Sequence, residues 1–89
     1  MFKAVATTRF AKDVKLARKR GKDLSKLHNI MDLLLKGKKL PHKNLDHWLN
    51  GNYNNRRECH IEPDWLLIYK PESEEIIFER TGTHSDLFK

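Results

Sequence analysis

The chain of 89 residues is 38% hydrophobic and 34% charged, a balance that suits one small folded domain and excludes a disordered tail. Eighteen Lys and Arg against twelve Asp and Glu give a formal net charge of +6 at pH 7, which favours binding to polyanions such as RNA. The single cysteine, Cys59, excludes an intramolecular disulfide, and the sequence has neither a signal peptide nor the run of about 20 apolar residues that a membrane helix needs, so we expect one cytoplasmic domain over residues 1–89 that contacts no membrane.

The N-terminal half predicts a strand followed by two antiparallel helices. Residues 2–6 are typical of a short strand, and the hydroxyl of Thr7 or Thr8 can cap a helix after it. That helix has three apolar residues on one face, at helical spacing: Phe10, Val14 and Ala17. Gly21 ends it, and Asp23 can cap a second helix, whose apolar stripe consists of Leu24, Leu27, Ile30, Met31, Leu34 and Leu35. Because only a few residues join the two helices, they must lie antiparallel.

Beyond residue 45 the apolar period shortens to that of strands. We expect strands, joined by turns, at residues 45–49, 56–61, 65–69 and 76–81. The third is continuously apolar, which indicates a central position in the sheet. The N-terminal strand must pair with a later one, and the last strand is the preferred candidate. The order predicts an α+β fold, in which an N-terminal strand and a two-helix hairpin precede three to four antiparallel strands and the helices pack on one face of the sheet.

The strand before the central one carries the densest group of ionisable residues. Because side chains alternate along a strand, Arg56, Glu58 and His60 share one face and lie outside the core, whereas Cys59 and Ile61 point inward. One interpretation is a solvated surface with a cross-strand ion pair. In that case Glu58 pairs with Arg56. The alternative is that Glu58 is an auxiliary base.

Three histidines offer a catalytic interpretation, because antiparallel pairing can bring together the strand ends that carry His47, His60 and His84. Imidazoles can act as base and acid at neutral pH, and an arginine can hold a phosphate with two hydrogen bonds. Cleavage of RNA needs little more, since the 2′-OH is an internal nucleophile. The sequence has no CxxC or HExxH ligand pair, so we expect neither a metal nor a cofactor.

Two strings in the C-terminal half resemble a known family: DHWLNGNYNNRRECHIEPDWLLIYK and FERTGTHSDLF. They are similar to the YafQ group of the RelE/ParE superfamily, bacterial type II toxins that act as ribosome-dependent endoribonucleases. The resemblance covers nearly the whole chain, and its most specific segments are His60–Trp65 and Arg80–His84. It implies a helical hairpin on an antiparallel sheet. It also implies a toxin that enters the ribosomal A site, cuts the mRNA there and inhibits translation.

The resemblance further implies roles for individual residues. By this resemblance, His84 matches the family residue that donates a proton to the leaving oxygen. Arg80 matches the residue that binds the scissile phosphate. His60, aided by Asp64 or by His47, is similar to the group that accepts or orients the 2′-OH proton. The motif does not decide which of these two histidines does so.

Aromatic residues near the implied cleft have two interpretations each. The rings of Trp65 and Phe88 can stack on an unpaired base. Trp65 suits the core equally well, and Phe88 can cap the sheet edge. Asp64 is either the partner of a histidine or a turn former. Trp48 departs from the family pattern, because we expect a small residue or proline directly after His47.

Basic residues are expected to hold the RNA. The candidates are Arg56 in the sheet and Lys12 and Lys15 on the first helix, with ribosomal RNA contacts added by Lys19, Arg20, Lys36, Lys38, Lys39 and Lys43. The resemblance implies a cognate acidic antitoxin of the DinJ type as the partner. Two alternatives stay open: a toxin of the same fold that poisons DNA gyrase, which needs no acid or base, and a non-catalytic basic module that binds RNA or a partner protein.

Overall fold

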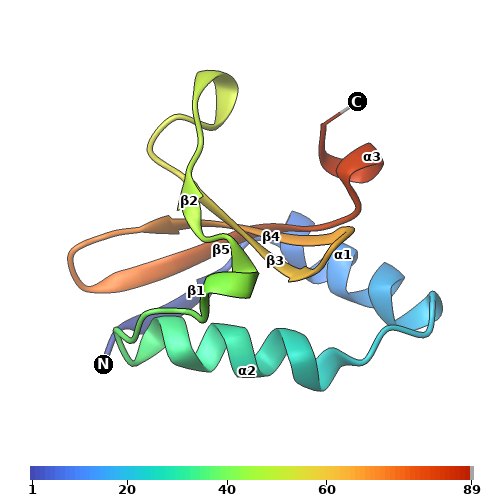
Figure 1. Cartoon of the computed structure of the whole chain (residues 1–89), viewed down its shortest axis with the longest axis horizontal. Helices are drawn as coiled ribbons and strands as arrows, with labels where there is room; N and C mark the ends of the chain where they lie inside the picture. The colour runs from blue at the N-terminus through green and yellow to red at the C-terminus, as the bar shows by residue number, and fades with distance from the viewer. Residues whose placement is uncertain (89) are drawn as a thin grey trace.

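The computed structural model describes residues 1–88 as one sheet with helices on both of its faces (Figure 1). The strands are β1 (Lys3–Ala6), β2 (His47–Trp48), β3 (Arg57–Glu62), β4 (Trp65–Pro71) and β5 (Glu75–Gly82). The helices are α1 (Thr8–Lys19), α2 (Leu24–Leu35) and α3 (His84–Leu87), and single 3-10 turns cover His42–Asn44 and Gly51–Tyr53. Within this described part, no helix is long and apolar enough to cross a membrane.

The five strands form one mixed sheet in the order β1-β5-β4-β3-β2. The pairs β2–β3, β3–β4 and β4–β5 are antiparallel, and β1 runs parallel to β5. The predicted α+β fold is confirmed, with the N-terminal strand beside the last strand and β4 at the centre. The strand predicted over residues 45–49 is wrong in length. Only His47 and Trp48 pair with β3, because Leu45 has a left-handed backbone with φ of 49°, which a strand does not contain.

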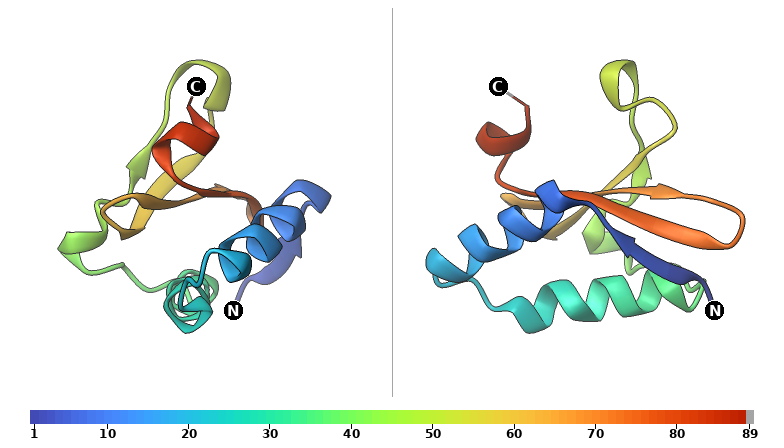
Figure 2. Two further views of the ribbon diagram at one scale, coloured as in Figure 1. Left: turned by 90° about the vertical axis from the view of Figure 1, so that its right-hand side faces the viewer. Right: turned by 180° about the vertical axis from the view of Figure 1, so that it is seen from behind.

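Helices α1 and α2 begin and end where the sequence predicts. The Thr7 hydroxyl accepts a hydrogen bond from the Phe10 N–H at 3.0 Å, and the Asp23 carboxylate accepts one from the Ser25 N–H at 3.0 Å. Gly21 follows α1 with φ of 79°, the left-handed conformation in which glycine is favoured. Both helices lie on the same side of the sheet, and the two views of Figure 2 show them as a hairpin.

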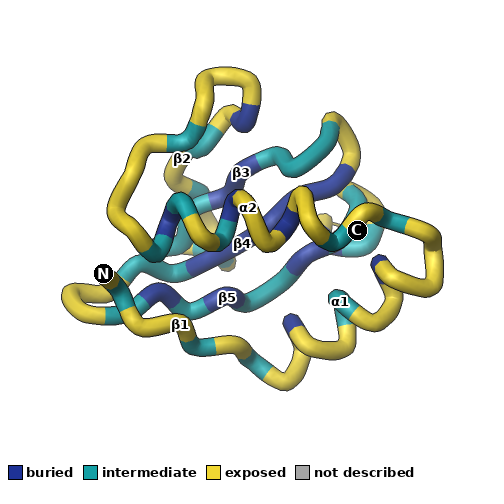
Figure 3. The backbone as a smooth tube through the Cα atoms, turned by 90° about the horizontal axis from the view of Figure 1, so that it is seen from below, coloured by how far each residue is buried: buried dark blue, intermediate teal, exposed yellow. Residues whose placement is uncertain are grey.

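The main core lies between this hairpin and the sheet, and Figure 3 shows the buried positions of β4 and β5 beneath α2. It is formed by Phe10, Ala17, Leu27, Ile30, Leu34, Cys59, Trp65, Leu67, Tyr69, Ile76 and Phe78. The Trp65 indole N–H donates to the Thr81 hydroxyl at 2.9 Å, and that hydroxyl donates to the Leu66 carbonyl at 2.6 Å. The buried polar end of the indole is thereby satisfied.

The other face of the sheet is partly covered, contrary to the prediction that it lies outside the core. A second apolar cluster consists of Leu66, Ile68 and Leu87, with Leu49 and Tyr53 packed against it. In Figure 1, α3 and the segment that includes β2 both rise from this side, opposite α2. Glu58 lies there with only 6% of its surface exposed. We call this side of the sheet the open face.

Candidate active site

The candidate site lies on the open face, over two adjacent rows of paired residues that run across the sheet. The first row joins Arg80 of β5, Ile68 of β4, Glu58 of β3 and His47 of β2. The second joins Gly82, Leu66 and His60 in the same way. Directly paired residues in neighbouring strands project to the same face. Strand pairing therefore brings Arg80, Glu58, His47 and His60 to one side of the sheet.

His84 completes this group from the first residue of α3. Its ring lies with its centroid 5.6 Å from that of His60, with an angle of 63° between the ring planes. The structure thus brings together the two histidines that the sequence motifs single out. His47 belongs to the same group through Glu58, whose Oε2 lies 3.1 Å from His47 Nε2 and 3.9 Å from His60 Nε2.

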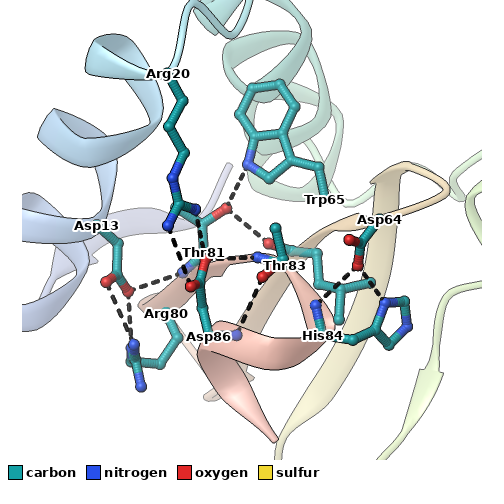
Figure 4. Close-up of polar contacts among 10 residues, drawn as sticks. Asp13, Arg20, Asp64, Trp65, Arg80, Thr81, Thr83, His84 and Asp86 are labelled. Carbon is teal, nitrogen blue, oxygen red and sulfur yellow. Dashed lines mark hydrogen bonds and ion pairs between the residues drawn. The ribbon is translucent and has the colours of Figure 1, made fainter.

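Asp64 fixes the orientation of the His84 ring. Its Oδ1 accepts the His84 backbone N–H at 2.9 Å and lies 2.6 Å from the ring Nδ1 (Figure 4). These two hydrogen bonds from His84 lower the pKa of Asp64 below its usual value. Because a carboxylate only accepts hydrogen bonds, Nδ1 carries the proton and Nε2 is left for other chemistry. Asp64 is therefore a histidine partner, but of His84 and not of His60.

Glu58 is a buried carboxylate between two imidazoles. The Nδ1 of His47 lies 2.6 Å from the Leu45 carbonyl oxygen, which can only accept, so this nitrogen carries a proton. The other ring nitrogen of His47, Nε2, faces the Glu58 carboxylate at 3.1 Å. Both nitrogens of this imidazole therefore have protein partners.

One interpretation of the sequence expected Arg56 and Glu58 to form an ion pair. In the structure they do not pair with each other. The Arg56 Nε donates to Glu79 Oε1 at 2.9 Å, and this hydrogen bond raises the pKa of Arg56. Glu79 stands on β5, two strands away from β3. The ion pair of Arg56 thus spans the sheet, while Glu58 turns to the histidines.

Arg80 is held by α1. Its Nε and Nη2 donate to the two oxygens of Asp13 at 2.7 and 3.3 Å, and Asp13 Oδ2 also accepts the Thr81 N–H at 3.1 Å. The Asp13 hydrogen bond raises the pKa of Arg80. Asp13 does not use the N–H groups of Nη1, which can donate to an anion. Lys12 and Arg80 line a hollow beside Asp13.

The two aromatic candidates, Trp65 and Phe88, differ in their exposure. Trp65 is 1% exposed and its ring lies in the main core, so its stacking on a base is wrong and the core interpretation holds. Phe88 is 42% exposed and contacts Tyr53 edge to face, with 5.6 Å between ring centroids. Lys12 and Lys15 are exposed on α1. Arg20, assigned by sequence to ribosomal RNA, forms an ion pair with Asp86 at 2.6 Å.

Sequence reasoning missed Asp13 and Tyr53 and left Glu58 undecided. Asp13 is one acidic residue on a basic helix, and its only signal was that isolation within a run of lysines and arginines. Within the described residues 1–88, no group of three or more His, Cys, Asp and Glu side chains is placed to hold a metal ion. The chemistry that the site offers is proton transfer by the neighbouring imidazoles of His60 and His84, with Arg80 on the same face of the sheet.

The chain belongs to a class of bacterial toxins: the family model described as a bacterial toxin of type II toxin-antitoxin systems, YafQ, matches residues 2–89. A curated relative, mRNA interferase toxin YafQ of Escherichia coli (strain K12), is 50% identical over 80 residues, which cover 89% of this chain and 87% of the relative. The chain belongs to the YafQ family.

Solved structures agree with this assignment. The crystal structure of YafQ from Escherichia coli superposes with a TM-score of 0.95 at 43% identity and covers 100% of both chains. A chain in the Escherichia coli DinJ-YafQ toxin-antitoxin complex matches with a TM-score of 0.92 at 45% identity, over 99% of this chain and 98% of that one. The predicted resemblance and the predicted fold are both confirmed.

Proposed function

We propose that this chain is an mRNA interferase, an endoribonuclease toxin that cuts mRNA through acid–base catalysis and so inhibits translation in the bacterial cytoplasm. Its membership in the YafQ family and the name of its 50% identical relative support this class of activity. The observation that carries the mechanism is the placement of His60 and His84, with ring centroids 5.6 Å apart and Asp64 bound to Nδ1 of His84.

In the proposed reaction the 2′-oxygen of the substrate attacks the adjacent phosphorus and the bond to the 5′-oxygen breaks. A base takes the 2′-OH proton, and an acid gives a proton to the leaving 5′-oxygen. The products are a 2′,3′-cyclic phosphate and a 5′-OH. No step requires a metal, because the nucleophile belongs to the RNA and the charge on phosphorus can be met by N–H donors.

We assign the acid to His84: Asp64 holds its Nδ1–H, so that the ring, when it is also protonated at Nε2, gives that second proton to the leaving 5′-oxygen. The base is His60. His47 faces the Glu58 carboxylate with one ring nitrogen and donates to the Leu45 carbonyl with the other, so neither nitrogen is free for the substrate. Arg80, held by Asp13, binds the scissile phosphate through Nη1.

The ribosome supplies the alignment that the site itself lacks. The exposed lysines Lys12 and Lys15 and the net charge of +6 favour binding to ribosomal RNA and mRNA in the A site. Binding in a prepared geometry can account for a large share of a rate enhancement. Free RNA is therefore a poor substrate of this chain.

The proposed partner is an acidic antitoxin of the DinJ type. Its support is the DinJ-YafQ complex, whose toxin chain matches this one closely, together with the basic charge of this chain. Complementary charge speeds association and makes it sensitive to salt. Copurification with the product of the adjacent gene at low and high salt tests this partnership.

The decisive experiment compares wild type with His84→Ala on translating ribosomes. His28→Ala is the control, because His28 is exposed on α2, remote from the site. We expect all three to sediment with ribosomes, and only His84→Ala to lose mRNA cleavage. Cleavage by His84→Ala at the wild-type rate would exclude the proposed acid. A supercoiling assay with gyrase separates this activity from that of a gyrase poison.

A further inference from the structure

We propose that Arg20, Asp86 and Gly82 form a clamp that positions His84 by tying α3 to the end of α1. This inference rests on the proposed function of His84 as the acid. Arg20 and Asp86 do not touch the reacting atoms in this proposal. They are positioning residues that act through the placement of the α3 backbone.

The clamp centres on the Asp86 carboxylate (Figure 4). Its Oδ2 accepts from Arg20 Nη1 at 2.6 Å, and its Oδ1 accepts from Nη2 at 3.3 Å. The same Oδ2 accepts the Thr83 N–H at 2.9 Å, while the Asp86 N–H donates to the Thr83 hydroxyl at 3.1 Å. Asp86 therefore caps α3 and joins it to α1 with one side chain.

The ion pair connects the short helix α3 to α1, a helix that is packed into the core. Helix α3 has 4 residues, too few to be stable by itself in water. Arg20 directly follows α1, whose Phe10 and Ala17 are buried in the main core. His84 is the first residue of α3, two positions before Asp86. A tie at Asp86 thus limits the rotation and tilt of the turn that carries the His84 ring.

Gly82 makes the approach of Asp86 possible. A Cβ at position 82 would lie 2.8 Å from Asp86 Oδ2 and 3.0 Å from its Cβ, closer than real contacts allow. The backbone of Gly82 does not have the left-handed φ that favours glycine, so the reason for glycine is clearance. The hydrogen bond from Arg20 also holds the pKa of Asp86 well below its usual range.

An exposed ion pair usually adds little to folding stability. The clamp therefore predicts an effect on turnover that is separate from stability. The side chain of Arg20 is 42% exposed and that of Asp86 is 25% exposed. A displacement of about 1 Å at a catalytic group can cost on the order of 100-fold in rate.

The test uses full-length variants on ribosome-bound mRNA, with kcat and KM measured separately. Arg20→Ala removes the tie but leaves the Asp86 cap, and Gly82→Ala pushes Asp86 away without removing a polar group. Arg18→Ala is the control, since it removes an equal charge from an exposed position two residues earlier. We expect kcat to fall about tenfold in Arg20→Ala and in Gly82→Ala, with KM within about twofold of wild type.

The double variant Arg20→Ala/Gly82→Ala should lose no more than the worse single variant, because both break the same contact. An increase in KM alone would mean that Arg20 binds the ribosome, and an unchanged kcat would mean that the clamp is incidental. Either result overturns the proposal.

A second measurement does not depend on cleavage. The ring resonances of His84 in the free protein should shift in Arg20→Ala and stay in place in Arg18→Ala. Unmoved resonances in Arg20→Ala would overturn the clamp even if activity fell. Shifted resonances in a protein whose wild type cuts no mRNA would instead support the clamp and refute the nuclease.

Discussion

Asp64 receives two hydrogen bonds from the same residue, from the backbone N–H of His84 at 2.9 Å and from its ring Nδ1 at 2.6 Å. The turn between β3 and β4 is thereby joined to the start of α3, which follows β5. One carboxylate sets both the position of the helix start and the tautomer of its imidazole.

Asp64→Ala should lower mRNA cleavage about 10–100-fold, because the His84 ring loses the partner that fixes its tautomer and orientation. Asp64→Asn keeps an acceptor for the backbone N–H and should lose less. Single-turnover cleavage on ribosomes gives the rates, and nitrogen NMR of the His84 ring gives the tautomer. A wild-type rate in Asp64→Ala would show that the ring needs no such support.

Glu58→Gln should also reduce cleavage, because the neutral amide replaces the carboxylate that lies 3.1 Å from His47 Nε2 and 3.9 Å from His60 Nε2. We expect a loss of about 10–100-fold, with the fold retained since the two side chains are nearly equal in size. Glu74→Gln is the control, a like change at an exposed position of the β4–β5 loop. Equal cleavage by both variants would leave His47 and Glu58 with a structural role only.

The sequence predicts the elements of this fold well where local signals determine them. The caps at Thr7 and Asp23 and the apolar stripe of α2 each depend on spacing within one segment, and the structure has them where expected. The 45–49 strand failed because the left-handed backbone of Leu45 has no local signal in a leucine. The alternation of apolar and polar residues in the sequence continues through a segment where the chain turns.

The partners within the site were harder to predict, because they depend on contacts between distant segments. Asp13 lies 67 positions from Arg80 in the sequence, and Arg20 lies 66 positions from Asp86. Alternation placed Glu58 and His60 on one face correctly, but it could not show that α3 and Tyr53 cover that face. The contact of Glu58 with His47 depends on the register of β2, which no local pattern determines.

Acid should destabilise the protein through Asp86. Its pKa in the folded state lies well below its usual value because of the Arg20 hydrogen bond, whereas in the unfolded chain it is about 3.9. As the pH falls below that value, the unfolded chain takes up a proton before the folded chain does. The free energy of unfolding therefore decreases until the pH reaches the lower folded-state pKa of Asp86. Thermal unfolding from pH 6 to pH 2 should show a shallower decline for Asp86→Asn than for wild type. Parallel curves for the two proteins would contradict a close ion pair in solution.

Cys59 should be inert in the native protein. The thiol is 0% exposed, and burial raises its pKa far above the usual range, so almost no thiolate forms near neutral pH. Iodoacetamide at pH 8 should label it only through unfolding, at a rate that rises with urea, and labelling in concentrated urea gives the fully accessible rate. Fast labelling without denaturant would show that β3 opens locally.

The proposed use of the 2′-OH as nucleophile gives a prediction about the substrate itself. An mRNA with a single 2′-deoxy nucleotide on the 5′ side of the cut should bind the ribosome and the toxin normally but resist cleavage, because no oxygen is present to attack the phosphorus. A deoxy nucleotide one position further along leaves the nucleophile in place and should be cut at the usual rate. Cut RNA should carry a 2′,3′-cyclic phosphate, or the 3′-phosphate formed from it, and a 5′-OH. A 5′-phosphate end, or equal cleavage of the two deoxy substrates, would mean that water is the nucleophile, and the assigned roles of His60 and His84 would then not hold.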